Sequence, residues 1–196
     1  MKTSVLMCLV EIIEHRGAGY MAIRIIREEG DEILKKKSKD VELIDDKIRE
    51  LIADMIETVH KYNGIGLAAV QVGVLKKVVV IDLYEEGTEP FILVNPYIIE
   101  KSGEQEVDEG CLSFPNKFAK VKRPKKVTVK ALNEFGEKIT LSGEGLLAQA
   151  LIHEMDHLEG ELFIEKMIPG TLEIVTEEQK EEKKEQRKKN SEKNNV

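Results

Sequence analysis

The apolar residues between Leu43 and Val59 recur at intervals of three and four positions. This spacing places them on one face of a helix and leaves the polar residues on the other face. Asn63 and Gly64 follow the run, and such a pair is typical of the end of a helix. The sequence therefore predicts an amphipathic helix over residues 43–59 that packs its apolar face against a core.

Three later stretches have the composition of strands. They are residues 76–83, 91–99 and 126–141, and the last contains a polar, glycine-bearing turn from Asn133 to Gly136. A turn of this kind between two runs of alternating apolar and polar residues predicts an antiparallel hairpin. The middle of the chain is therefore expected to be rich in antiparallel strands.

A second helix is predicted over residues 144–158, with Ser142 and Gly143 before it and Gly160 as its stop signal. The order of elements is helix, strands, helix, and it lacks the repeating alternation of strands and helices that builds parallel sheets. This order favours a single α+β domain.

Composition narrows the class of protein. The chain has 196 residues, of which 41% are apolar and 34% charged, as in a soluble globular domain. The formal net charge of −7 argues against a protein dedicated to binding DNA. The two cysteines, Cys8 and Cys111, do not suggest a disulfide framework, so a reducing cytoplasm is the expected compartment. The apolar run from Val5 to Val10 is too short to span a membrane.

The chain is expected to divide into three parts. Met21 opens a stretch that reads as the start of a domain, so residues 1–20 form an extension of unknown role and residues 21–172 form the core domain. Residues 173–196 form a charged tail, which after Val175 lacks an apolar residue until Val196. Such a segment cannot bury an apolar face, so we expect it to be disordered or partly helical.

The sequence "LIHEMDHLEG" carries the clearest chemistry. On a helix, His153 and His157 lie on one face, with the carboxylate of Glu154 beside them. Two imidazoles at this spacing are typical of a metal site. The alternative is an amphipathic helix with two incidental histidines, but the chain has only four histidines and two of them fall at the ligand spacing.

The third ligand is expected upstream of this helix. A catalytic metal site needs three protein ligands and an open position, and no histidine or cysteine follows His157. Cys111, in "EGCLSFP", lies at the end of a predicted strand, and a thiolate binds zinc or ferrous iron strongly. The alternative is a buried cysteine that acts only as a small apolar residue.

A third segment, "GIGLAAVQVG" over residues 64–73, contains two closely spaced glycines and Gln71, whose amide can donate a hydrogen bond. A nucleotide-binding loop is disfavoured because the third glycine and the Lys-Ser/Thr pair of such loops are missing. The glycines more plausibly allow the backbone to approach a substrate closely.

Together, "GIGLAAVQ", "EGCLS" and "HEMDH" in this order resemble the three signature motifs of peptide deformylases. These metallohydrolases remove the formyl group from the N-terminal methionine of newly synthesised bacterial proteins. The resemblance covers Met21 to Ile168. It implies an α+β domain in which the helix with the His-Glu-x-x-His motif is packed among antiparallel strands.

The resemblance also implies a role for each motif residue. The metal ligands would be Cys111, His153 and His157, and Glu154 would move a proton from water to the leaving amine. The side-chain amide of Gln71 and the backbone N–H of Leu112 would stabilise the developing oxyanion. The substrate would be an extended N-formylmethionyl peptide, paired with backbone edges at Ile65 and Gly110. The substrate-contacting residues would be Ile65, Gly66, Val107, Gly110, Leu146, Gln149 and Ala150.

Two positions leave questions open. Gln149 departs from the aliphatic residue that is common in the family, so it bears on side-chain preference. Asp156 is either a carboxylate that orients a metal ligand or a solvated acid on the helix. The metal implied by the resemblance is Fe²⁺ in the cell, with Zn²⁺ or Ni²⁺ able to replace it in purified protein.

Two other kinds of protein remain in view. One is a zincin-type metallopeptidase, which shares the helix motif but generally takes its third ligand downstream. The other is a non-catalytic protein with a structural zinc, in which a residue such as His60 closes the site as a fourth ligand.

The tail suggests a further partner. Deformylases act on chains that emerge from the ribosome, and Lys183 to Lys189 form a cationic stretch. We expect this stretch to contact ribosomal RNA through its phosphates. DNA and membranes are not expected as partners.

Overall fold

The computed structural model describes residues 22–176 and residue 179. The predicted extension over residues 1–20 and most of the predicted tail lie outside the described residues. The described part is an α+β structure, as predicted. Its helices are η1 (Glu32–Lys35), α2 (Asp46–Lys61), η2 (Ala69–Val72), α3 (Leu146–Glu159) and α4 (Phe163–Lys166). Its strands are β1 (Gly66–Ala68), β2 (Val78–Ile81), β3 (Phe91–Ser102), β4 (Gln105–Cys111), β5 (Phe114–Arg123), β6 (Lys126–Leu132), β7 (Lys138–Glu144) and β8 (Glu173–Ile174).

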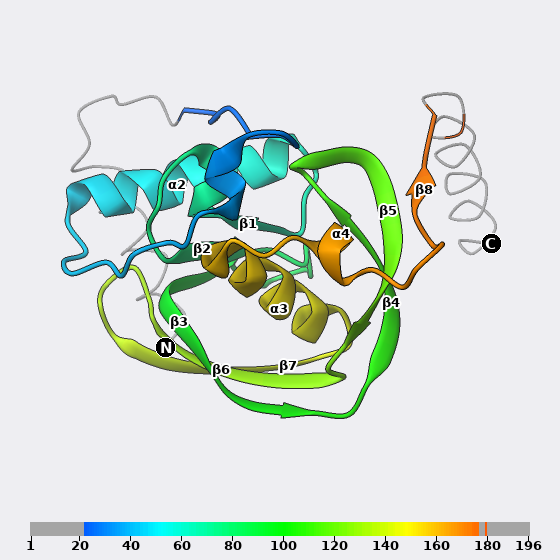
Figure 1. Cartoon of the computed structure of the whole chain (residues 1–196). Helices are drawn as coiled ribbons and strands as arrows, with labels where there is room; N and C mark the ends of the chain where they lie inside the picture. The colour runs from blue at the N-terminus through cyan, green and yellow to red at the C-terminus, as the bar shows by residue number, and fades with distance from the viewer. Residues whose placement is uncertain (1–21, 177–178, 180–196) are drawn as a thin grey trace, which may run out of the picture.

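The larger sheet is antiparallel and has the strand order β1-β2-β3-β6-β7. Successive side chains of a strand point to opposite faces, so β2 serves two cores. Val79 and Ile81 pack with α3, whereas Val78 and Val80 pack with α2. Figure 1 shows α3 in the middle of the molecule, with strands curving around it.

Helix α2 confirms the first predicted helix, with a later start. The carboxylate of Asp45 accepts a hydrogen bond from the Ile48 N–H at 3.0 Å, and this cap sets the first turn. Leu43, the first residue of the predicted helix, lies outside it and is exposed. The spacing of apolar residues alone placed the predicted start of the helix before this cap.

Helix α3 confirms the second predicted helix and ends at Gly160, as expected. Ser142 and Gly143 were expected to precede the helix as its start signal, but they belong to β7. They pair with Thr128 and Val127 of β6, so the strand continues almost to the first turn of α3. This direct passage anchors the start of α3 to the sheet.

The smaller sheet has the order β4-β5-β8. Strands β4 and β5 form a long antiparallel hairpin that carries Cys111 at its turn. Strand β8 pairs with Lys117 and Phe118 of β5, and Val175 beyond it is buried. Packed structure therefore continues to Val175. In the described part of the chain, no helix is long and apolar enough to cross a membrane.

Candidate active site

Cys111, His153 and His157 come together from two elements. Cys111 is the last residue of β4, and both histidines lie on α3. The Cys111 Sγ is 3.2 Å from the His157 Nε2, and one potential ligand atom of each residue lies within 4.8 Å of the other two. Ligands that share one metal at about 2.0–2.3 Å must lie this close together. One thiolate and two imidazoles are therefore arranged as a donor set for a divalent transition metal.

Glu109 orients His153. Its Oε2 is 3.0 Å from the His153 Nδ1, which leaves the other ring nitrogen available to the ligand cluster. Burial alone would raise the pKa of Glu109, but hydrogen bonds from Arg123 and His153 outweigh burial and lower it to about 2. Glu109 lies two residues before Cys111 in the motif "EGCLSFP". Strand alternation puts both side chains on one face, so the position two residues before Cys111 indicates this role in the sequence itself.

Arg123, the last residue of β5, holds Glu109 in place. Its Nε and one terminal nitrogen bind the two Glu109 oxygens at 2.6 and 2.8 Å, and both side chains are almost fully buried. The other terminal nitrogen donates to Asp156 at 2.7 Å, and Lys166 binds the second Asp156 oxygen at 2.6 Å. Glu109, and not Asp156, is therefore the carboxylate in contact with His153, whereas Asp156 binds Arg123.

The two histidines differ in protonation. Burial, followed by the charges of His153 and Arg123, lowers the pKa of His157 well below its ordinary value, so this ring is neutral. Burial also lowers the pKa of His153, but hydrogen bonds with Cys111 and Glu109 reverse this and raise it well above its ordinary value. These surroundings therefore favour the charged form of His153 and the neutral form of His157.

Glu154 lies beside this cluster and is buried. Burial raises its pKa to about 7. Its Oε2 has no hydrogen-bond partner within the described part of the chain. Gly66 makes room for this side chain, because a Cβ built at Gly66 would lie 2.4 Å from the Glu154 Oε1. A buried carboxylate with one unpartnered oxygen and a pKa near neutrality can both accept and release a proton.

Gln71 and Leu112 approach the cluster from the other side. The Gln71 Oε1 accepts from the Ala68 N–H at 2.8 Å, so its Nε2 is directed to Cys111 Sγ at 3.4 Å and to Ser113 Oγ at 3.2 Å. Leu112 follows Cys111, and a Cβ at Gly64 would lie 2.7 Å from its Cδ1. The Gln71 amide therefore borders the ligand cluster, and Leu112, directly after Cys111, lines the same pocket.

A pocket of about 1440 Å³ opens onto these residues, and it is large enough for several residues of a peptide. Val107, expected among the substrate contacts, is absent from the pocket wall in the described structure, whereas its neighbour Asp108 is present. Val107 shares a strand face with Glu109, so its side chain is directed elsewhere than that of Asp108. The other predicted contacts line the pocket: Ile65, Gly66, Gly110, Leu146, Gln149 and Ala150.

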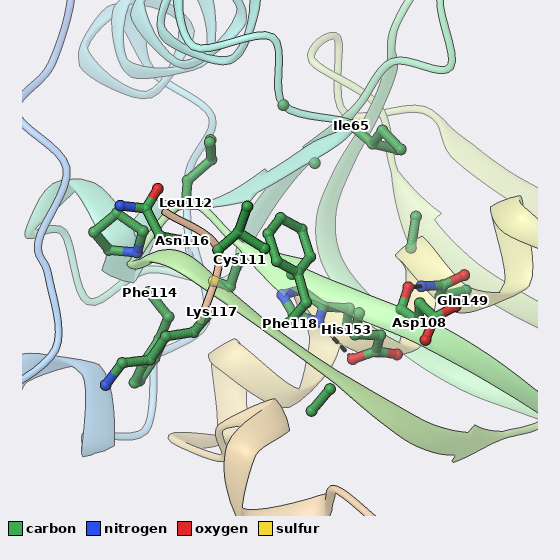
Figure 2. A pocket seen from close by; sticks show the side chains of 18 of the residues that line it. Ile65, Asp108, Cys111, Leu112, Phe114, Asn116, Lys117, Phe118, Gln149 and His153 are labelled. Atoms are coloured by element: carbon green, nitrogen blue, oxygen red, sulfur yellow. Dashed lines mark hydrogen bonds and ion pairs between the residues drawn. The ribbon is translucent and has the colours of Figure 1, made fainter. Parts of the chain in front are cut away.

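Strand β4 presents to the pocket backbone groups that do not pair with β5. The N–H of Lys120, which pairs with Asp108, donates to Thr171 Oγ1 at 3.1 Å and so points away from β4. In such a pair, the backbone groups of both residues face outward. The Asp108 carbonyl indeed accepts from the Gln149 side chain at 3.1 Å (Figure 2). Gly110, two residues further along, presents its backbone on the same edge.

The opposite wall is the edge strand β1. The carbonyl of Ile65, where a substrate edge was expected, accepts from the Asp82 N–H at 2.8 Å and faces β2. By alternation, the backbone groups of Gly66 face away from β2. The open edge is therefore presented by Gly66, while the Ile65 side chain borders the pocket (Figure 2).

The geometry disfavours both alternative kinds of protein. In the described part of the chain, the group of side chains able to hold a metal is Cys111, His153 and His157. His60 instead lies 2.7 Å from Asp82, so it does not close the site as a fourth ligand. The third ligand comes from upstream of the helix, unlike the usual arrangement in zincins.

Three side chains able to hold a metal, a carboxylate next to one of them and an open pocket are typical of a metal-dependent hydrolase. The family described as polypeptide deformylase matches residues 23–172. The chain belongs to this family.

The similarity to known proteins extends over about three quarters of the chain. The chain is 58% identical over 146 residues to peptide deformylase 2 of Clostridium acetobutylicum, covering 74% of this chain and 95% of the relative. The crystal structure of a peptide deformylase from Legionella pneumophila is 46% identical, with a TM-score of 0.73, covering 76% of this chain and 88% of that chain. A Met-Ala-Ser-bound peptide deformylase from Acinetobacter baumannii is 31% identical, with a TM-score of 0.72, covering 76% and 100%.

Proposed function

We propose that Cys111, His153 and His157 hold one divalent metal and that Glu154 transfers the proton when this enzyme removes the formyl group from N-formylmethionyl peptides. The observation that carries the proposal is the unpartnered Glu154 oxygen, buried beside the three converging ligands. Family membership supports the reaction, and the geometry supports the roles.

Each of these residues has its own role in the reaction. A divalent metal at these ligands would polarise the formyl carbonyl and make water easier to deprotonate. Glu154 accepts the proton of the attacking water and delivers it to the nitrogen of the departing amine. The Gln71 amide and the Leu112 N–H donate to the carbonyl oxygen as it gains negative charge.

The substrate lies extended between two backbone edges. Gly66 and Gly110 pair with its main chain, which allows recognition that does not depend on the peptide sequence. Its methionine side chain lies against Ile65, Leu146 and Ala150. Gln149 remains compatible with this apolar surrounding because its amide is bound to the Asp108 carbonyl, which leaves its methylene groups for the pocket.

The central test is formate release under anaerobic conditions, with metal content measured on the same sample. Metal-loaded protein should release formate from formyl-Met-Ala-Ser and leave acetyl-Met-Ala-Ser intact. An absence of formate from metal-loaded protein would refute the proposal, and cleavage of internal peptide bonds would favour a metallopeptidase.

We propose Fe²⁺ as the metal in the cell, with Zn²⁺ or Ni²⁺ replacing it in purified protein, because a thiolate and two imidazoles suit all three. Cys111→Ser should lower metal retention and activity together, since a hydroxyl is a much weaker ligand than a thiolate. Metal analysis after dialysis against a chelator checks this. Full metal retention in the variant would show that Cys111 is not a ligand.

We also propose that the protein acts in the cytoplasm on nascent chains and that the tail around Lys183 to Lys189 contacts ribosomal RNA. The support is charge alone, since these residues lie outside the described structure. Truncation after Val175 should leave peptide turnover unchanged and reduce co-sedimentation with ribosomes at low salt. Equal co-sedimentation of both forms would reject the contact.

A further inference from the structure

The backbone from Gly64 to Gly66 touches two residues of the proposed machinery. A Cβ at Gly64 would meet Leu112, and a Cβ at Gly66 would meet Glu154, both well inside contact distance. The same segment carries the open edge at Gly66. Its position therefore affects the proton-transfer carboxylate, the neighbourhood of the oxyanion donor and the peptide-binding edge together.

Asp82 and Tyr84 bind two consecutive carbonyls of this segment. The Ile65 carbonyl accepts from the Asp82 N–H, and the Gly64 carbonyl accepts from the Tyr84 hydroxyl, each at 2.8 Å. The Tyr84 hydroxyl also lies 3.4 Å from the Val59 carbonyl, at the point where α2 ends. Tyr84 is thus a side-chain tether on a segment that precedes the regular pairing of β1.

Tyr84 is itself held in an unfavourable conformation. Its φ is +56°, which is rare for a bulky residue and persists only where the surroundings enforce it. Its N–H donates to the Asp82 Oδ1 at 2.7 Å, and the Asp82 Oδ2 lies 2.7 Å from the His60 Nε2. The His60 and Tyr84 rings have centroids 5.6 Å apart. Asp82 and His60 therefore fix Tyr84, although half of its side chain is exposed.

We propose that Tyr84 is a positioning residue for the deformylation site and that it acts through the Gly64 carbonyl, with Asp82 holding it in place. The inference rests on the proposed function, because it assigns Tyr84 to the wall on which the peptide and Glu154 meet. A strained, half-exposed tyrosine that binds a carbonyl of the active-site wall fits this role better than a role in the core.

The test compares metal-loaded wild type, Tyr84→Phe and the control Tyr97→Phe, which changes a similarly exposed tyrosine on β3. Tyr84→Phe should lower kcat/KM for formyl-Met-Ala-Ser by roughly three- to tenfold, as expected for one lost hydrogen bond. Its Kd for Met-Ala-Ser should weaken by a similar factor. Metal content and Tm should match those of the wild type, and Tyr97→Phe should change none of these quantities.

A second comparison asks whether Asp82 acts through Tyr84. Asp82→Ala should reproduce the loss in kcat/KM, and the double variant should be no worse than the more impaired single variant. Unchanged kcat/KM and Kd in Tyr84→Phe would overturn the proposal, as would a lower Tm with normal turnover. Failure of the wild type to release formate would instead refute the proposed function.

Discussion

Glu154→Ala is expected to keep its metal and to lose deformylation by a factor of about 10²–10⁴. Glu154 is not part of the Cys111, His153 and His157 cluster, so its removal leaves the ligands intact. The variant lacks the group that accepts the proton of water and returns it to the amine. Turnover of formyl-Met-Ala-Ser and metal content, measured on one sample, check both halves of the prediction.

The matched control is Glu159→Ala, which removes an exposed carboxylate from the same helix and should leave turnover unchanged. Near-normal formate release by metal-loaded Glu154→Ala would show that another group transfers the proton. Loss of the metal would show that Glu154 is a ligand or supports one.

Arg123→Met is expected to lower the free energy of unfolding by about 3–5 kcal/mol. Glu109, 1% exposed, and Arg123, 3% exposed, form a buried pair, so removing the guanidinium leaves the Glu109 carboxylate in the interior with its main charge partner gone. Lys126→Met, which breaks the exposed pair with Glu144, should cost less than about 1 kcal/mol. Urea unfolding of the metal-loaded proteins measures both values.

A double variant separates stability from metal support. With methionine at both position 109 and position 123, much of the lost stability should return, since the Glu109 carboxylate is no longer buried without Arg123 and Asp156 keeps its bond to Lys166. Metal affinity should stay about 10- to 100-fold weaker, because His153 has lost the carboxylate that orients it. Wild-type metal affinity in the double variant would show that Glu109 does not support the ligand.

The sequence predicted the two main helices, the hairpin and the ligand cluster because these features are encoded locally. His153 and His157 share a helix face whatever surrounds the helix. Cys111 was found by elimination and by its motif. The pairing of Glu109 with Arg123 was not found, because 14 residues separate them and the register of β4 on β5 places Arg123 opposite Gln105, not opposite Glu109.

Other details depended on hydrogen bonding that spacing does not reveal. Strand pairing decides that Ser142 and Gly143 belong to β7, and it directs the Ile65 carbonyl to Asp82. It likewise leaves Val107 out of the pocket wall within the described structure. The tether from Tyr84 could not be predicted, because a positive φ at a tyrosine has no signature in local sequence preference.

Gly66 and Gly110 line one pocket, and each belongs to a strand at the edge of its sheet. An exposed edge can pair with a further strand. Under the proposed binding mode, the partner of both edges is a single extended chain, so we expect deformylation to require an N-terminus that has not yet folded. A formyl group that a completed fold has buried should then be removed only after local unfolding.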